Sequence, residues 1–186
     1  MKKFSNYLKT LAAVNGLDHP SLEWLFYPGM LQDSRQMWWA DFGSRRTLHE
    51  GLDICFYRSG RTISALAPGA RVPALADGII LNISRDLLGH SLVVSLGPGF
   101  HETAGIIPVM VYSHLDPLPQ LAPGDRIKKG EILAKIFDAR TVKSRLRSHL
   151  HLSCLLIPGS VNRTCLNWSL FADRSRVDYI NPVFIW

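Results

Sequence analysis

The sequence predicts an all-β core, built as an antiparallel two-sheet sandwich or open barrel and preceded by a short helical N-terminal segment. From Leu48 onward, short apolar runs alternate with Gly, Pro and Asp turns about every ten residues, a spacing typical of short antiparallel strands. Residues 4–15 instead place apolar side chains at helical spacing. The chain has 186 residues, 47% of them hydrophobic, which fits one compact domain with a sizeable core.

Residues 1–45 are expected to form an N-terminal segment of helical and irregular structure. In the first helix, Phe4, Leu8 and Leu11 share one face, and Gly16 ends the helix. A second helical turn is expected over residues 21–26, before a Pro-Gly pair. Residues 30–46 contain three aromatic side chains that we interpret as packing rather than recognition: Trp38, Trp39 and Phe42.

Residues 46–186 are expected to form the β domain. Its short apolar runs and the turns beside them lie at residues 67–72, 76–81, 91–96, 109–115 and 122–125. Three glycines and two prolines predict a loop over residues 97–108. The tail after Ile157 is rich in loops, and a last strand is expected within residues 180–186.

Charge and hydropathy exclude some classes of function. The 21 basic and 15 acidic residues give a net charge of +6, which favours anionic partners without choosing among them. No stripe of alternating basic and aromatic residues is present, which argues against a nucleic-acid binder. No apolar run approaches the ~18 residues that span a bilayer, so no stable membrane insertion is expected. The N-terminus begins Met-Lys-Lys like a signal peptide, but Ser5, Asn6 and Lys9 interrupt the apolar stretch, so no signal peptide is expected.

The three cysteines do not form a disulfide framework. Their number is odd and no C-x-x-C pair is present, which also excludes a cysteine-based zinc knuckle. Cys154 and Cys165 could pair in an oxidising compartment. The expectation is that Cys55, Cys154 and Cys165 are free, buried thiols.

Histidines and one aspartate form the constellation that carries chemistry. Side chains two apart on a strand share a face, so His149 and His151 point the same way. His49 and Asp53 are four apart and also share a face of an extended segment, and the glycine between them argues against a helix. Imidazole and carboxylate groups are good zinc ligands, and three protein ligands plus one water are typical of a catalytic zinc site. Each motif alone is common, but together with His114 in an intervening strand they indicate a zinc cleft.

Six motifs in order make the stretch from about Leu48 to Ser153 resemble the lysostaphin/LytM-type zinc metallopeptidases, which cleave peptide bonds in bacterial cell walls. The first is His49-Glu-Gly-Leu-Asp53, which resembles H-x-G-x-D, and the last is His149-Leu-His-Leu-Ser, which resembles H-L-H-F-E. The other four are Val72-Pro-Ala-Leu-Ala-Asp-Gly-Ile-Ile, Gly89-His-Ser-Leu-Val-Val, Tyr112-Ser-His-Leu and Gly124-Asp-Arg-Ile-Lys-Lys-Gly-Glu-Ile-Leu.

The resemblance implies a role for each residue of the constellation. His49, Asp53 and His151 would hold one zinc ion per chain, and His114 and His149 would be catalytic. The substrate would be a peptidoglycan stem peptide or crossbridge, and the expected location is therefore the periplasm or cell envelope. Two departures stand out: a longer loop carrying His101 and Glu102, interpreted as solvated, and Leu152-Ser153 in place of Phe-Glu, a change expected to touch no ligand.

Two other functions compete with the peptidase. A catalytically silent binding or regulatory module of the same fold usually lacks one or more ligands, whereas all five positions are filled here. A carrier domain of the biotinyl or lipoyl type would explain the echo between residues 72–78 and 124–133, but the chain lacks the lysine tip that such a domain presents. The sequence does not fix the oligomeric state, nor whether residues 1–45 close the cleft.

Overall fold

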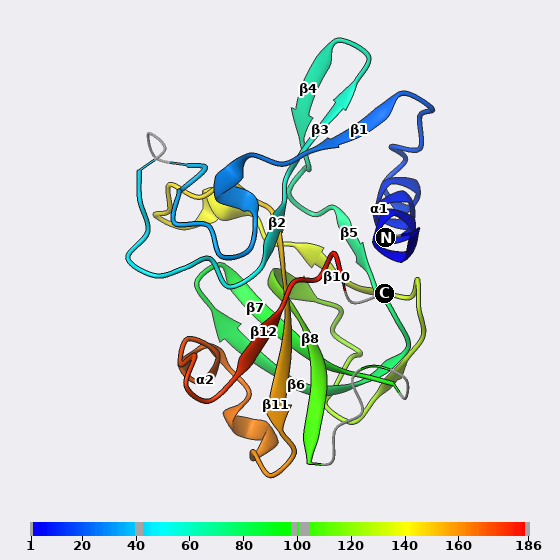
Figure 1. Cartoon of the computed structure of the whole chain (residues 1–186). Coiled ribbons are helices and arrows are strands. Elements are labelled where there is room, and N and C mark those ends of the chain that lie inside the picture. Colours follow the sequence, from blue (N-terminus) through cyan, green and yellow to red (C-terminus); the bar gives the residue numbers. More distant parts are fainter. Residues whose placement is uncertain (1, 40–42, 98–99, 101–104, 185–186) are drawn as a thin grey trace.

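The computed structural model describes residues 2–39, 43–97, 100 and 105–184, and it has two antiparallel sheets with one N-terminal helix (Figure 1). The helix α1 spans Lys2–Val14, which confirms the helix expected over residues 4–15. The smaller sheet has the order β1-β3-β4 and projects at the top of Figure 1. Its strands are β1 (Leu22–Leu25), β3 (Phe56–Ser59) and β4 (Thr62–Ala65).

The larger sheet has nine strands, and its main path runs β12-β11-β8-β7-β6-β9. The remaining strands pair beside this path, β2 with β11 and β10 with both β5 and β8. The described strands do not close into a barrel. Their bounds are β2 (Leu52–Ile54), β5 (Arg71–Pro73), β6 (Gly78–Asp86), β7 (Gly89–Leu96), β8 (Ile106–Pro117), β9 (Arg126–Ile127), β10 (Ile132–Ile136), β11 (Leu150–Pro158) and β12 (Asp178–Ile180). Short helical turns complete the fold: η1 (Pro28–Met30), η3 (Ala139–Thr141), η4 (Arg163–Cys165) and α2 (Trp168–Phe171).

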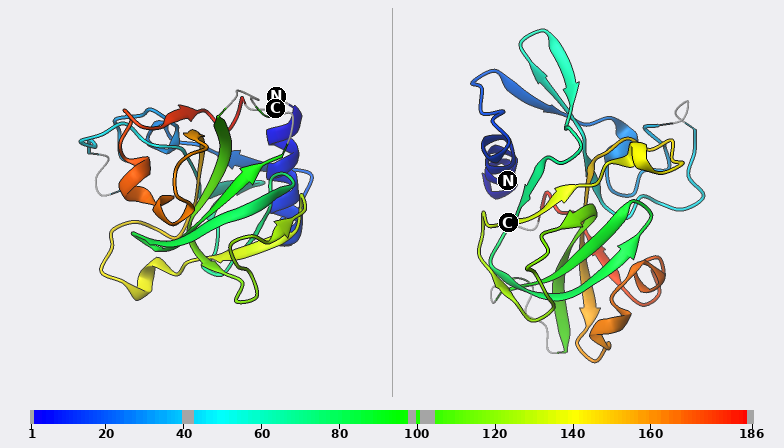
Figure 2. Two further views of the ribbon diagram at one scale, coloured as in Figure 1. Left: turned by 90° about the horizontal axis from the view of Figure 1, so that it is seen from below. Right: turned by 180° about the vertical axis from the view of Figure 1, so that it is seen from behind.

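Successive side chains of the central strands point to opposite faces of the large sheet, so the core is divided between these two faces. On one face Leu92 and Tyr112 belong to a cluster that includes three side chains of α1, namely Phe4, Tyr7 and Leu11. On the other face Val93 and Val111 pack with the C-terminal segment around α2. Helices α1 and α2 accordingly lie on opposite sides of the sheet in the left view of Figure 2. A central strand covered on both faces explains the nearly continuous apolar runs of β7 and β8.

Two local predictions are wrong. Residues 21–26 do not form a helical turn, because Leu22–Leu25 pair with the exposed edge of β3, and a helical turn of that length has little stability of its own. Cys165 is exposed rather than buried, whereas Cys55 and Cys154 are buried and all three thiols are free. Of the loop predicted over 97–108, residues 98–99 and 101–104 lie outside the described residues, His101 and Glu102 among them, and residues 106–108 begin β8.

The division into residues 1–45 and 46–186 stays a prediction, although α1 contributes to the main core. Across the described part of the chain, no helix combines the length and apolar character needed to cross a membrane.

Candidate metal centre

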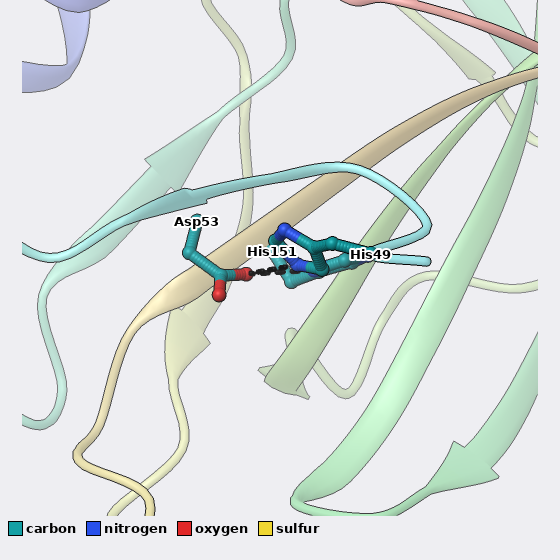
Figure 3. A group of neighbouring side chains, drawn as sticks. All are labelled: His49, Asp53 and His151. Carbon is teal, nitrogen blue, oxygen red and sulfur yellow. Dashed lines mark hydrogen bonds and ion pairs between the residues drawn. The ribbon is translucent and has the colours of Figure 1, made fainter. Parts of the chain in front are cut away.

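Strand pairing brings together two of the three expected metal ligands. Asp53 in β2 lies opposite His151 in β11, and opposite side chains of an antiparallel pair lie about 5 Å apart. His49 lies just before β2, and its ring centroid is 5.0 Å from that of His151. The three residues are buried, with exposed fractions of 3% for His49, 2% for Asp53 and 5% for His151. Figure 3 shows the three side chains pointing toward one another.

Gly51 permits this close approach of β2 to β11. A Cβ atom at this position would lie 2.2 Å from the carbonyl oxygen of Leu152 and 2.7 Å from Oγ of Ser153. No side chain fits there without moving the backbone of β11. The glycine of the first motif therefore has a packing role in the site.

The three side chains present one potential ligand atom each toward a common point. Asp53 Oδ1 lies 2.7 Å from His151 Nδ1 and 3.2 Å from His49 Nε2. The two imidazole nitrogens are 3.2 Å apart. Ligand atoms bonded tetrahedrally to one zinc ion at 2.0–2.1 Å stand about 3.3 Å from each other, so the spacing is close to that of a zinc site.

The other ring nitrogens of the two histidines are held by acceptors. His49 Nδ1 lies 3.0 Å from the carbonyl oxygen of Leu31, and His151 Nε2 lies 2.9 Å from Oγ of Ser153. Ser153 donates its own proton to the carbonyl oxygen of Glu50, so its oxygen accepts from His151. Each ring therefore turns an unprotonated nitrogen inward, the tautomer that a metal ligand requires. Ser153 does contact a candidate ligand, His151, which corrects the expectation that the change from Glu to Ser touches none.

The second carboxylate oxygen of Asp53 is also fixed. Trp38 donates its indole N–H to Oδ2 over 2.6 Å, and a guanidinium nitrogen of Arg45 lies 3.7 Å from the same oxygen. Arg45 in turn donates to the carbonyl oxygens of Gly29 and Gln36 and stacks over the Trp39 ring. The segment before β2 therefore orients a candidate ligand, a contribution that the sequence did not indicate for Trp38.

His114 and His149 lie beside the three candidate ligands, with ring centroids 4.8 Å apart. His149 Nδ1 lies 2.7 Å from the carbonyl oxygen of Arg147, and its Nε2 lies 3.4 Å from Asp53 Oδ1. His114 Nδ1 lies 3.4 Å from Asp86 Oδ1. The structure thus places all five predicted residues in one cluster, three with converging ligand atoms and two next to them.

Burial and neighbouring charges shift the pKa values in this cluster. Burial lowers the pKa of His151 to about 4 and also lowers the pKa of His114, so both rings are neutral near pH 7. Burial alone would lower the pKa of His149, but the Asp53 carboxylate outweighs it and raises that pKa. Burial alone would raise the pKa of Asp53, but His49 and His149 hold it well below its ordinary value. An ionised Asp53 carboxylate beside the neutral His151 ring is a protonation state that favours binding of a metal cation.

The cluster forms the floor of a pocket of about 310 Å³. The walls are largely apolar, with Trp39, Leu87, Leu146 and Trp168 around the polar floor. Trp168 packs against His151 at a ring distance of 5.5 Å. A pocket with apolar walls and a few convergent polar groups is typical of a small-molecule or peptide site.

The donor set fits a zinc ion. Two imidazole nitrogens with lone pairs directed inward and one carboxylate oxygen form a three-ligand set, and the free side of the set faces the pocket. Without a cation, three buried acceptor atoms would face one another with too few protons to pair them. Four further residues contact the cluster, and no sequence motif indicated a role for them there: Trp38, Arg45, Asp86 and Trp168. Only contacts between residues distant in sequence reveal them.

No family model and no curated protein matches the chain. Among solved structures it is similar to the antimicrobial peptidase lysostaphin from Staphylococcus simulans, at 19% identity and a TM-score of 0.42, over 62% of this chain and 39% of that one. It is also similar to Csd3 from Helicobacter pylori, at 14% identity and a TM-score of 0.44, over 87% of this chain and 36% of that one. A third is a catalytic-domain variant of the prophage-encoded M23 protein EnpA from Enterococcus faecalis, at 18% identity and a TM-score of 0.42, over 77% of this chain and 96% of that one.

These similar structures include the peptidase family that the motifs resemble. The chain spans less than half the length of the lysostaphin and Csd3 chains. For these three structures the TM-scores are all below 0.5 and the identities all below 25%.

Proposed function

We propose that this protein is a zinc-dependent metalloendopeptidase that hydrolyses peptide bonds in peptidoglycan stem peptides or crossbridges. One observation carries the proposal: three ligand atoms 2.7–3.2 Å apart converge on the floor of a pocket, and two further imidazoles lie beside them. His49, Asp53 and His151 would hold one zinc ion. When bound, zinc would activate a water molecule and polarise the scissile carbonyl group.

His114 and His149 would carry the proton transfers. Each ring has its Nδ1 engaged by an acceptor outside the pocket, so Nε2 is the nitrogen that would meet the reacting groups. In His149 this nitrogen also lies 3.4 Å from Asp53 Oδ1. One imidazole would accept the proton of the attacking water at Nε2 and pass it to the leaving amine, and the other, when protonated at Nε2 as well, would donate a hydrogen bond to the developing oxyanion. The apolar walls of the pocket would hold the peptide and limit access of bulk water.

The substrate class is supported by the order of the six motifs, and the net charge of +6 is compatible with an anionic polymer such as the cell wall. An enzyme with this substrate would act in the periplasm or cell envelope.

Digestion of purified peptidoglycan, with and without a zinc chelator and analysed by mass spectrometry, tests the proposal. We expect new amine ends that appear with zinc and not with the chelator, and their masses would identify the bond. Release that is insensitive to the chelator would contradict a metallopeptidase. A folded, zinc-loaded sample that binds peptidoglycan but releases no ends would favour the silent binding module.

A further inference from the structure

His114 has an unusual backbone for a residue within a strand. It lies in β8 with a φ of +66°, and among the described residues only one other non-glycine residue, Asp33, has a positive φ. The pairing of β8 with β7 shifts register at the same level, between His90 and Leu92. L-residues rarely adopt this conformation, and it persists only where surrounding groups determine it. Some neighbouring group must therefore hold His114.

Asp86 at the end of β6 is that group. Its carboxylate binds His114 twice: Oδ2 accepts the backbone N–H over 2.9 Å, and Oδ1 lies 3.4 Å from ring Nδ1. The side chain of Asp86 is 1% exposed. Burial alone would raise the pKa of Asp86, but hydrogen bonds from His114 and Ser91 outweigh it and hold that pKa well below its ordinary value. An ionised carboxylate only accepts, so Nδ1 of His114 carries the proton and Nε2 has a free lone pair.

A role in the turn alone does not account for these contacts. Asp86 begins the β6–β7 turn, and its Oδ1 accepts the N–H of Leu88 over 2.8 Å, as aspartates often do in turns. That role requires no contact with a residue 28 positions away. The carboxylate is also part of a wider buried network, because Ser91 donates to it over 2.6 Å and accepts the indole N–H of Trp168 over 3.0 Å. The network therefore connects the β6–β7 hairpin with His114 and with Trp168 in the wall of the pocket.

We propose that Asp86 is a positioning residue that fixes both the backbone and the ring tautomer of His114, so that Nε2 faces the pocket. The carboxylate is not one of the three converging ligands, and it acts only through His114. The consequence for catalysis rests on the function proposed above, whereas the tautomer is a property of the folded chain and can be measured without a substrate.

The test compares the zinc-loaded wild type with Asp86→Asn, which keeps the shape of the side chain but can donate toward Nδ1. The tautomer is measured by long-range ¹H–¹⁵N NMR of protein labelled with ¹⁵N-histidine. The signals of His114 are those that are missing from the spectrum of His114→Gln. We expect the Nδ1–H form in the wild type and the Nε2–H form in Asp86→Asn. On peptidoglycan peptides, kcat should fall about 100-fold, the size typical of a lost proton-transfer group, while KM and zinc content stay close to the wild type.

Asp125→Asn is the matched control, because it makes the same substitution in an aspartate that also accepts a backbone N–H in a turn, that of Ala122 over 2.8 Å, and not that of His114. It should keep the Nδ1–H tautomer and a kcat near that of the wild type. If Asp86→Asn does not fold, the wild-type spectrum alone still decides, since an Nε2–H tautomer of His114 would overturn the proposal. An Asp86→Asn protein with unchanged tautomer and kcat would overturn it too. An inactive wild type with the Nδ1–H tautomer would contradict the proposed function and leave the positioning of His114 supported.

Discussion

At the scale of single residues, the candidate centre separates atoms that can bind a metal from atoms that hold the ligands in place. Asp53 uses Oδ1 toward the two histidines and Oδ2 toward Trp38 and Arg45. His151 directs Nδ1 inward and is held by Ser153 at Nε2. Each ligand thus has one functional atom and one anchored atom, so ligand and neighbouring residues should give different phenotypes when substituted.

Substitution of the five central residues should separate metal binding from turnover. His49→Ala, Asp53→Ala and His151→Ala each remove a ligand atom and should reduce zinc from about one per chain to near zero, because three ligands are the minimum of a catalytic site. His114→Ala and His149→Ala should keep the zinc and lose about 10²- to 10⁴-fold in kcat. Metal analysis and peptidase assays on the purified variants measure both. Full zinc content in His151→Ala would contradict the ligand assignment.

Trp38 offers a test of how the ligands are held. Trp38→Phe removes the N–H that binds Asp53 Oδ2 and keeps an aromatic ring in the small core with Met30 and Cys55. Loss of a group that orients a ligand typically weakens metal affinity by about 10- to 100-fold, and we expect a change of that size in a competition titration with a zinc chelator. Phe56→Leu is the control, since Phe56 contacts the Trp38 ring but has no bond to Asp53. If Trp38→Phe and Phe56→Leu lost the same amount of zinc affinity, the effect would come from packing and not from the hydrogen bond to Asp53.

At the scale of elements, the centre depends on β2 lying close against β11. Gly51→Ala would place a Cβ atom 2.2 Å from the carbonyl oxygen of Leu152 and force the two strands apart. We expect a loss of about 2–3 kcal/mol in the free energy of unfolding, together with weaker zinc binding, because Asp53 and His151 face each other across this pair. Chemical denaturation and zinc titration measure the two effects. Gly97→Ala is the control: its nearest neighbour would be 4.0 Å away. Normal zinc affinity in Gly51→Ala would show that the close approach is not needed.

The elements also show what the sequence could and could not predict. The alternation of side chains along β11 and the spacing of His49 and Asp53 predicted which side chains share a face. The structure brings all five predicted site residues, these two with the three histidines of β8 and the β11 region, into one cluster. Local spacing could not predict that Leu22–Leu25 would add to the edge of β3, since a long-range partner decides that strand. The same limit applies to Trp38 and Asp86, whose contacts with Asp53 and His114 join residues 15 and 28 positions apart.

At the scale of the whole molecule, a metal bound between β2 and β11 would join the segment before β2 to the centre of the large sheet. Because the ligand atoms come from two distant parts of the chain, the unfolded protein offers no comparable site, and binding energy becomes folding energy. At a zinc concentration about 1,000 times Kd, the folded state should gain ~4 kcal/mol. For a domain of this size that gain corresponds to a rise of roughly 8–16 °C in Tm.

Thermal unfolding of the full chain with zinc and with excess chelator measures this stabilisation. The wild type should unfold at the lower temperature in chelator and recover when zinc is restored. Asp53→Ala should unfold at the same temperature in both conditions, because it lacks the carboxylate oxygen that lies next to both histidine nitrogens. A wild type whose Tm does not change on chelation would mean that the cluster holds no zinc in the folded protein, even if peptidase activity were found. The experiment therefore tests the metal centre independently of the substrate.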